Sequence, residues 1–254
     1  MLQLVDGGHP LPLGYWRAFR GTARRLFRPQ NPQDLLLPSW ASLQSTGASV
    51  RTVELQNLLS SDVTGDWSLD NATIDFLWRW LRRARPRVIL ECGAGISTII
   101  LAAYAATQRA AGQESPRVFS IEQEGRIKEE TEARLARCGW SDYVHIFHAP
   151  LNGQDRYQVD ETALEQQVGD DKAEALLIDG PYGMAGCRIW TLPLLARFCR
   201  TGARWFLDDA FRDAEMGILQ AWARLPGAKV EGIHPIGKGL GTGLITFPQS
   251  VRRP

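Results

Sequence analysis

Short apolar runs alternate with longer amphipathic segments from about residue 70 onward, and this alternation constrains the fold more than any other feature. The apolar runs have the length of buried strands, and the segments between them have helical spacing. The expected strands cover residues 87–91, 118–122, 143–147, 175–179 and 203–208. The expected helices cover about 71–85, 97–111, 124–138, 162–168, 186–199 and 214–225. Such alternation predicts an α/β domain with a mostly parallel sheet and right-handed crossovers.

The end of the chain has a different pattern. Residues 229–235 and 242–247 are strand-like and are joined by a glycine-rich segment that contains Gly237, Gly239 and Gly241. We expect a hairpin here, which would add an antiparallel pair to the five parallel strands. The complete prediction is a Rossmann-like, seven-stranded sheet with a C-terminal antiparallel hairpin.

Residues 1–66 are expected to form a partly irregular N-terminal arm or cap, and residues 67–254 the main domain. Several prolines interrupt the arm, and residues 15–28 between them are rich in aromatic and basic side chains. This segment could contact a membrane surface or a partner, or it could simply pack on the domain with solvated arginines.

Composition excludes several classes of protein. The 254 residues carry a net charge of +1, so no overall field attracts nucleic acid, and a nucleic-acid substrate is not expected. The 4 cysteines are widely spaced and form no zinc or redox motif. We find no signal peptide and no run of roughly 18 apolar residues. The sequence therefore predicts a cytoplasmic protein without a transmembrane segment.

A glycine-rich turn follows the first predicted strand, in residues 91–97 (Glu-Cys-Gly-Ala-Gly-Ile-Ser). Gly93 and Gly95 allow a sharp turn and a close approach of the backbone to a ligand. The helix behind the turn presents unpaired N–H groups to that ligand. An acidic residue, a Gly-x-Gly turn and an apolar helix together indicate a cofactor loop.

The turn resembles the first motif of class I S-adenosylmethionine-dependent methyltransferases, with Ser97 in place of a third glycine. We expect Ser97 to cap the helix. The resemblance implies that the loop carries the amino acid part of S-adenosylmethionine, that Glu122 binds the ribose hydroxyls, and that the next strand ends lie near the adenine and the sulfonium. The cofactor-binding residues implied in this way are Glu91, Gly93, Ala94, Gly95, Ser97, Glu122, Gln123, His148, Ala149 and Asp179.

Two neighbouring strands are expected to end in aspartates at the same edge of the sheet. These are Asp179 and the pair Asp208 and Asp209. Carboxylates this close are costly unless a proton or a cation intervenes. The arrangement resembles that of metal-dependent catechol-type O-methyltransferases, which implies a Mg²⁺ site formed by the three residues. The alternative is one aspartate acting alone as general base while the other caps the next helix. Asp179 and Asp208 are the predicted catalytic residues.

The acceptor is suggested by residues 179–183 (Asp-Gly-Pro-Tyr-Gly), followed by Arg188 and by Leu-Pro-Leu-Leu at 192–195. This segment is similar to that of small-molecule and sugar methyltransferases, which implies O-methylation of a sugar, a glycan precursor or a hydroxylated natural product. His234 and Lys238 could border the acceptor pocket, and Trp67 and Ser68 could cover the cofactor.

Two other functions stay open from the sequence. A nicotinamide-dependent Rossmann oxidoreductase would need a third glycine where Thr98 stands, and Glu122 comes later than its ribose-binding acid usually does. A module that binds S-adenosylmethionine without turnover would need no catalytic aspartates.

Overall fold

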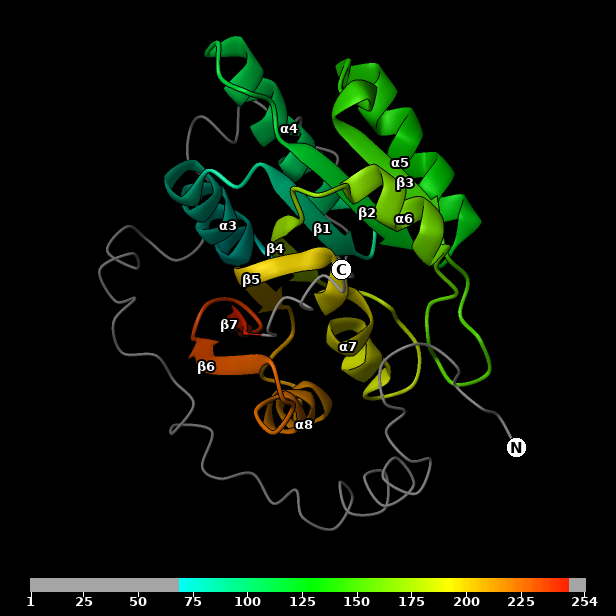
Figure 1. Cartoon of the computed structure of the whole chain (residues 1–254), viewed down its shortest axis with the longest axis vertical. Coiled ribbons are helices and arrows are strands. Elements are labelled where there is room, and N and C mark those ends of the chain that lie inside the picture. Colours follow the sequence, from blue (N-terminus) through cyan, green and yellow to red (C-terminus); the bar gives the residue numbers. More distant parts are fainter. Residues whose placement is uncertain (1–68, 247–254) are drawn as a thin grey trace, which may run out of the picture. The chain divides into compact units, whose positions relative to one another are not determined.

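The computed structural model describes residues 69–246, in which a seven-stranded sheet lies between two layers of helices (Figure 1). The strand order is β3-β2-β1-β4-β5-β7-β6, and β7 runs antiparallel to both of its neighbours. The predicted sheet and its C-terminal hairpin are thereby confirmed. The strands are β1 Val88–Cys92, β2 Arg117–Glu122, β3 Val144–His148, β4 Ala173–Ile178, β5 Cys199–Leu207, β6 Ala228–His234 and β7 Leu240–Ile245.

The helices follow the predicted order, with short 3₁₀ turns between them. The first described helix begins as expected, because the Asp70 side chain accepts hydrogen bonds from the backbone N–H groups of Ala72 and Thr73. The α-helices are α3 Asn71–Ala84, α4 Ile96–Ala110, α5 Gly125–Cys138, α6 Glu161–Val168, α7 Thr191–Leu195 and α8 Asp213–Trp222. The 3₁₀ turns are η3 Ser141–Tyr143, η4 Cys187–Trp190 and η5 Ala196–Phe198.

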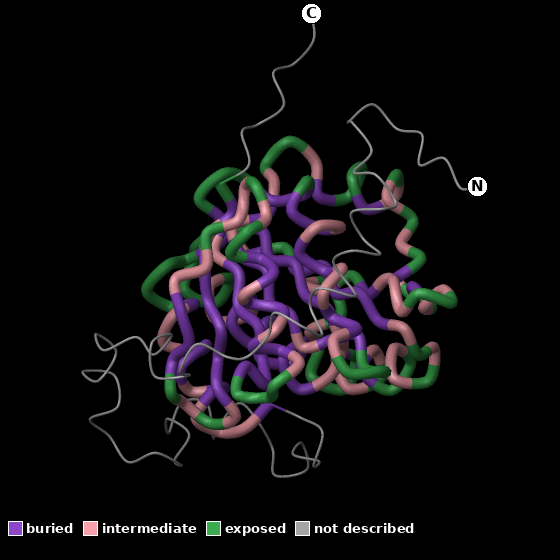
Figure 2. Tube along the Cα trace, turned by 90° about the horizontal axis from the view of Figure 1, so that it is seen from below, coloured by how far each residue is buried: buried purple, intermediate pink, exposed green. Residues whose placement is uncertain are grey.

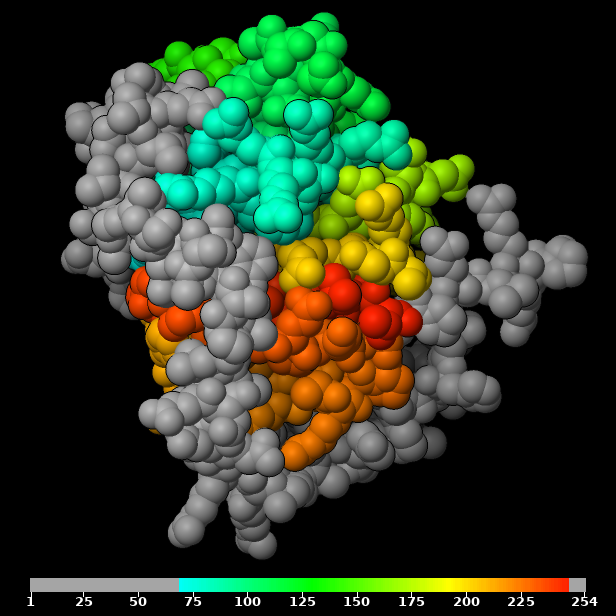
Figure 3. Space-filling model, turned by 90° about the vertical axis from the view of Figure 1, so that its left-hand side faces the viewer, coloured from blue at the N-terminus to red at the C-terminus, as the bar shows by residue number. Residues whose placement is uncertain are grey.

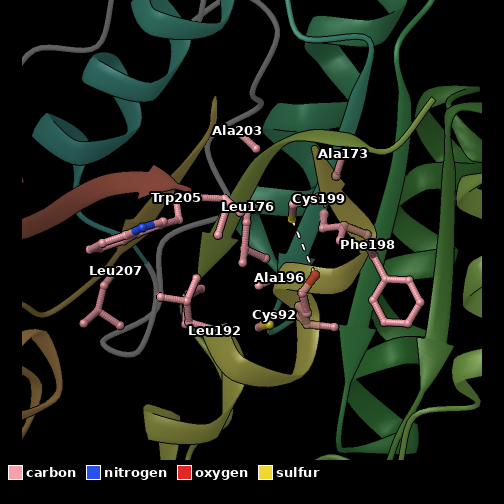
Figure 4. Packing of buried hydrophobic residues seen from close by; sticks show 14 of the residues in the cluster. Cys92, Ala173, Leu176, Leu192, Ala196, Phe198, Cys199, Ala203, Trp205 and Leu207 are labelled. Carbon is pink, nitrogen blue, oxygen red and sulfur yellow. Dashed lines mark hydrogen bonds between the residues drawn. The ribbon is translucent and has the colours of Figure 1, made fainter. Parts of the chain in front are cut away.

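Two apolar cores lie on opposite faces of the sheet. One packs α3, α4 and α5 against the strands, and the other packs α6, α7 and α8. The central strands are almost entirely buried (Figure 2). Figure 4 shows the second core, where Leu176 and Trp205 of the sheet lie among Leu192 and Phe198 from the segment around α7. Burial on both faces explains why these strands are continuous apolar runs in the sequence.

The prediction of a single helix over residues 186–199 is wrong. The segment consists of η4, α7 and η5, and Pro193 explains part of the break because it has no N–H to donate to the Ile189 carbonyl. That carbonyl accepts a hydrogen bond from Trp222 Nε1 instead, at 3.0 Å. A tertiary contact thus takes the acceptor that a continuous helix would have used.

The first strand begins one residue later than predicted, whereas β5 begins at Cys199 instead of Ala203. β4 and β5 each end one residue earlier than predicted, so Asp179 and Asp208 are the first residues beyond them. The four cysteines are free thiols, and no helix in residues 69–246 has the length and apolar character needed to span a membrane. The predicted N-terminal arm, its segment 15–28, Trp67 and Ser68 lie outside the described residues.

Candidate functional site

The glycine loop connects β1 to α4 at the centre of the sheet. β1 pairs with β2 on one side and β4 on the other, so this is the switch point at which open α/β sheets bind ligands. Gly93 has a φ of 89°, and a Cβ there would lie 2.9 Å from the Gly180 nitrogen. A Cβ at Gly95 would meet no atom within 4 Å. The loop therefore needs glycine on its inner side and leaves open space at Gly95.

Thr98, and not Ser97, caps the helix behind the loop. Its hydroxyl accepts a hydrogen bond from the Gly95 N–H at 3.0 Å and donates to Glu91 Oε2 at 2.6 Å. Ser97 makes no capping bond, so the predicted serine cap is wrong. Glu91 is fully buried, and burial raises its pKa to about 7 although nearby serine and threonine hydroxyls oppose the shift. Glu91 thus supports the loop from beneath, while its contact with a cofactor stays a prediction.

Glu122 lies beside this loop at the end of β2. Its Oε2 accepts a hydrogen bond from the Ala94 N–H at 2.7 Å, and its Oε1 accepts one from the Glu124 N–H at 2.8 Å. Burial raises the pKa of this carboxyl, and the same backbone N–H groups lower it. Each oxygen keeps further acceptor capacity. The two backbone hydrogen bonds therefore hold the carboxylate in place, while its contact with a ribose stays a prediction.

The residues expected near an adenine, Gln123, His148 and Ala149, form hydrogen bonds between the ends of neighbouring strands. The Gln123 side-chain amide donates to the Tyr182 carbonyl and accepts from the Tyr182 N–H, both at 3.0 Å. His148 Nε2 lies 3.2 Å from the Gln123 carbonyl oxygen, and the Ala149 N–H donates to the Glu122 carbonyl at 2.7 Å. These bonds link the ends of β2, β3 and β4. Adenine contacts by Gln123, His148 and Ala149 remain predictions.

The loop after β4 is held against the glycine loop. The N–H groups of Asp179 and Gly180 both donate to the Cys92 carbonyl, at 3.0 and 2.8 Å. Gly180 also packs against the buried hydroxyl of Tyr157 and the backbone of Gly93, so no larger residue fits there. The Asp179 side chain keeps 19% of its surface exposed. Sequence reasoning missed Tyr157 at this site, because Tyr157 lies in a loop that carries no recognisable pattern.

The three predicted aspartates come together. Oxygens of Asp179, Asp208 and Asp209 all lie within 4.8 Å of one another, which confirms that the ends of β4 and β5 meet. Asp209 has a φ of 59° and opens a turn in which its carbonyl accepts from the Arg212 N–H. α8 begins only at Asp213, with Arg212 as its N-cap residue. The alternative in which one of these aspartates caps the next helix is therefore wrong.

Side-chain cations surround the acidic cluster. Arg188, 6% exposed, lies 3.3 Å from Asp179 Oδ1 and 3.2 Å from Asp209 Oδ2, and it donates to the Asp208 carbonyl. Lys238 Nζ lies 3.2 Å from Asp209 Oδ1. Arg212 lies 2.9 Å from Asp209 Oδ2. The role of Arg188 was missed, since spacing along the chain does not show which carboxylates a long side chain reaches.

Burial dominates the electrostatics of the cluster. It raises the pKa of Asp208 to about 8, with further contributions from the charges of Asp179 and Asp209. The pKa of Asp179 is also raised by burial, against the opposing charge of Arg188. Both oxygens of Asp208 lack a hydrogen-bond partner among the described residues. One proton shared by Asp179 and Asp208 would relieve this repulsion.

Of the two candidate residues at the end of β6 and in the β6–β7 turn, only Lys238 contacts the aspartates. His234 is 1% exposed and packs on the Phe76 ring, with 4.8 Å between the ring centroids. This places His234 in the core beside α3, away from the aspartates. Figure 3 shows α3 in cyan beside the orange and red β6–β7 segment on the same face. Lys238 reaches the cluster from the same turn.

No protein-family model and no curated protein sequence matches the chain. Solved structures do. Cofactor-bound Rv0187 from MTB is 20% identical, with a TM-score of 0.56 over 87% of this chain and 100% of the other. A putative caffeoyl-CoA O-methyltransferase from Staphylococcus aureus is 13% identical, with a TM-score of 0.51 over 91% and 99% of the two chains. The O-methyltransferase TomG from Streptomyces achromogenes, solved with SAM, is 17% identical, with a TM-score of 0.50 over 72% and 83%.

These similarities define the fold, which is that of the class I S-adenosylmethionine-dependent methyltransferases. The strand order does not favour a nicotinamide-dependent oxidoreductase. Dinucleotide-binding sheets have the order 3-2-1-4-5-6, whereas β7 is inserted here between β5 and β6 and runs antiparallel.

Proposed function

We propose that this chain is an S-adenosylmethionine-dependent O-methyltransferase that acts on a small hydroxylated acceptor, such as a sugar, a glycan precursor or a hydroxylated natural product. One observation carries the proposal. The glycine loop, the Glu122 carboxylate and the Asp179–Asp208 pair meet at the same edge of the sheet. The names of the similar structures, among them O-methyltransferases and one solved with SAM, support it.

The residues present fit the cofactor. Glu122 would accept the ribose hydroxyls, and the glycine loop with the first turn of α4 would hold the amino acid part next to the open space at Gly95. Gln123, His148 and Ala149 would border the adenine, and Asp179 would face the sulfonium. Bound S-adenosylmethionine would supply an electrophilic methyl group.

Transfer would form a bond between an acceptor oxygen and this methyl carbon while the carbon–sulfur bond breaks and its electron pair stays on sulfur. The Asp179–Asp208 pair takes the hydroxyl proton as general base. Asp179, the partly exposed member, would face the incoming acceptor, whereas Asp208 is fully buried. The rate would come mainly from the positioning of the two reactants.

Exposed apolar side chains gather at the same edge. In the part of the chain that the structure describes, the exposed large hydrophobic residues are Tyr182, Met184 and Phe211. The first two follow β4 and the third follows β5, so all three lie on loops beside the aspartates. This placement suits an acceptor whose apolar part contacts these side chains while a hydroxyl reaches the carboxylates.

A cytoplasmic location remains a proposal from the sequence.

The predicted Mg²⁺ site has suitable donors, because three carboxylates converge within reach of one hard cation. Its charge is less suitable. Arg188, Arg212 and Lys238 already pair with these carboxylates. No step of the proposed transfer therefore depends on a metal ion.

The first test is thermal unfolding of the full chain with S-adenosylmethionine, S-adenosylhomocysteine or NADH. A ligand at 100 times its Kd stabilises the fold by about 2.7 kcal/mol. We expect both sulfur-containing ligands to raise Tm and NADH to have no effect. Glu122→Ala should remove the shift. Glu129→Ala, an exposed carboxylate on α5, is the matched control and should keep it. A shift with NADH alone would refute the proposal.

Turnover distinguishes an enzyme from a module that only binds the cofactor. Asp179→Asn and Asp208→Asn should keep the Tm shift with S-adenosylhomocysteine but lose transfer of a labelled methyl group to hydroxylated acceptors. The loss expected for removal of a general base is about 10²- to 10⁴-fold. If both variants transfer methyl groups at the rate of the unaltered protein, the aspartates are not the base.

A further inference from the structure

Lys238 occupies a rigid position in the turn between β6 and β7. Its N–H donates to Asp70 Oδ2 at 3.2 Å, and its carbonyl accepts from the Phe211 N–H at 3.1 Å. The next residue, Gly239, accepts from the Ala210 N–H at 2.9 Å and has a φ of 85°. The turn is thus tied both to the N-cap of α3 and to the loop after β5. These backbone hydrogen bonds consequently hold Lys238 where its ammonium group can reach the aspartates.

The ammonium lies against the two most deeply buried aspartates. Lys238 Nζ is 3.2 Å from Asp209 Oδ1 and 3.8 Å from Asp208 Oδ2. The lysine side chain keeps 36% of its surface exposed, whereas the two carboxylates keep 3% and 1%. Lys238 is therefore the more exposed partner in both ion pairs, and its ammonium covers carboxylates that are themselves almost fully buried.

The charges at the cluster can be counted from its ion pairs. Four carboxylates, Asp179, Asp208, Asp209 and Glu215, face the three cations Arg188, Arg212 and Lys238 within 4.0 Å. Lys238 thus supplies one of the three positive charges that face these carboxylates. Its removal would make the cluster more negative by one charge and so more attractive to a divalent cation.

A metal ion and this ammonium compete for the same oxygens. A cation bound to Asp208 and Asp209 would lie within a few ångströms of Lys238 Nζ, and like charges at that distance repel strongly in a buried site. Arg188 cannot withdraw to make room, because it is 6% exposed and also binds the Asp208 carbonyl.

We propose that the Lys238 ammonium is the resident cation of the Asp208–Asp209 pair, and that the site therefore works without a divalent metal ion. Lys238 is a positioning residue in this proposal, since it holds the two carboxylates together at the edge where the acceptor would bind. The claim that Lys238 occupies the place of a divalent cation rests on geometry alone. Its consequence for methyl transfer rests on the proposed function.

The binding test uses Mn²⁺ as the probe, followed by its electron paramagnetic resonance signal, on the full chain. We expect the unaltered protein to bind no Mn²⁺ at this site. Lys238→Met keeps the length of the side chain and removes the charge. The affinity of this variant for Mn²⁺ should exceed any affinity of the unaltered protein at least about tenfold. Lys238→Arg should remain unable to bind it. Lys229→Met, an exposed lysine on β6, is the matched control and should behave as the unaltered protein does.

Two results would overturn the proposal. One is Mn²⁺ binding by the unaltered protein that Asp208→Asn abolishes, and this measurement needs no lysine variant to fold. The other is a folded Lys238→Met protein that binds Mn²⁺ no better than the Lys229→Met control does.

Methyl transfer provides a separate readout. Transfer by the unaltered protein should survive chelation, whereas Lys238→Met should transfer slowly and recover with added Mg²⁺. Transfer that chelation abolishes and Mg²⁺ restores in the unaltered protein would contradict the proposal. The Mn²⁺ titration requires neither cofactor nor acceptor, so the proposed function can fail while the binding result stands.

Discussion

At the scale of single residues, Glu91 shows how burial changes the meaning of a motif residue. The sequence indicates a carboxylate at the cofactor loop, and the structure places it beneath the loop, hydrogen-bonded to Thr98. Its pKa is raised from 4.5 to about 7. A raised carboxyl pKa means that the folded state binds the proton more tightly than the unfolded state does. Stability linked to Glu91 is therefore greatest below pH 4.5 and is lost as the pH rises towards 7.

Glu91→Gln should remove this contribution to the pH dependence. A shift of this size corresponds to a difference on the order of 3 kcal/mol at most between the two ends of the window. Urea unfolding at pH 4.5 and pH 8 should therefore show a smaller loss of unfolding free energy for the variant than for the unaltered protein. The buried Asp208 contributes equally to both proteins, so the comparison isolates Glu91. An unchanged difference between the two pH values would mean that Glu91 titrates normally.

At the scale of secondary-structure elements, the site depends on how closely two loops meet. Gly93, after β1, and Gly180, after β4, touch through their backbones, and Tyr157 closes the contact. The requirement for Gly180 is steric, because a Cβ there would lie 2.9 Å from the Gly93 nitrogen. This contact explains why glycine stands between Asp179 and Pro181 in the loop after β4.

Gly180→Ala should separate the two loops and destabilise the fold by about 1–3 kcal/mol, as overpacking does. Gly183→Ala, in the same loop, is the matched control, since its added Cβ would meet its nearest atom at 3.9 Å. Denaturant unfolding measures both. Tyr157→Phe combined with Gly180→Ala should recover only part of the loss, because the Gly93 backbone still obstructs the Cβ. Equal stabilities for the two alanine variants would refute the steric account.

At the scale of the whole molecule, the site couples the two ends of the described chain. Asp70 binds the N–H of Lys238, and the residues of the proposed site come from the ends of β1, β2, β4 and β5 and from the β6–β7 turn. A ligand that spans these positions binds only the assembled sheet. It should therefore stabilise the sheet as a unit and not one loop alone.

Hydrogen exchange tests this coupling. S-adenosylhomocysteine at 100 times its Kd should slow exchange about 100-fold at amides that exchange through global unfolding. We expect this for the central strands β1, β4 and β5 alike, as measured by mass spectrometry of peptides. Protection confined to the glycine loop and Glu122 would show instead that the site closes locally.

The sequence by itself determined the parallel sheet, the C-terminal hairpin, the glycine loop and the acidic strand ends. These features follow from local pattern, since apolar runs specify buried strands and polar residues mark the points where they end. Asp179 and Asp208 could be placed together because parallel strands share one carboxyl edge.

Only the tertiary structure decided which side chains meet across the site. Local rules favoured a Ser97 cap, a continuous helix through residues 186–199 and a capping aspartate after β5. In the structure Thr98 forms the cap, and Arg212 is the N-cap residue of α8. The Trp222 side chain binds the Ile189 carbonyl, which a continuous helix would have used. The ion pairs of Arg188 and Lys238 were likewise invisible in the sequence. The partners of long flexible side chains depend on how the elements pack in space. The spacing of residues along the chain does not predict which groups come within reach.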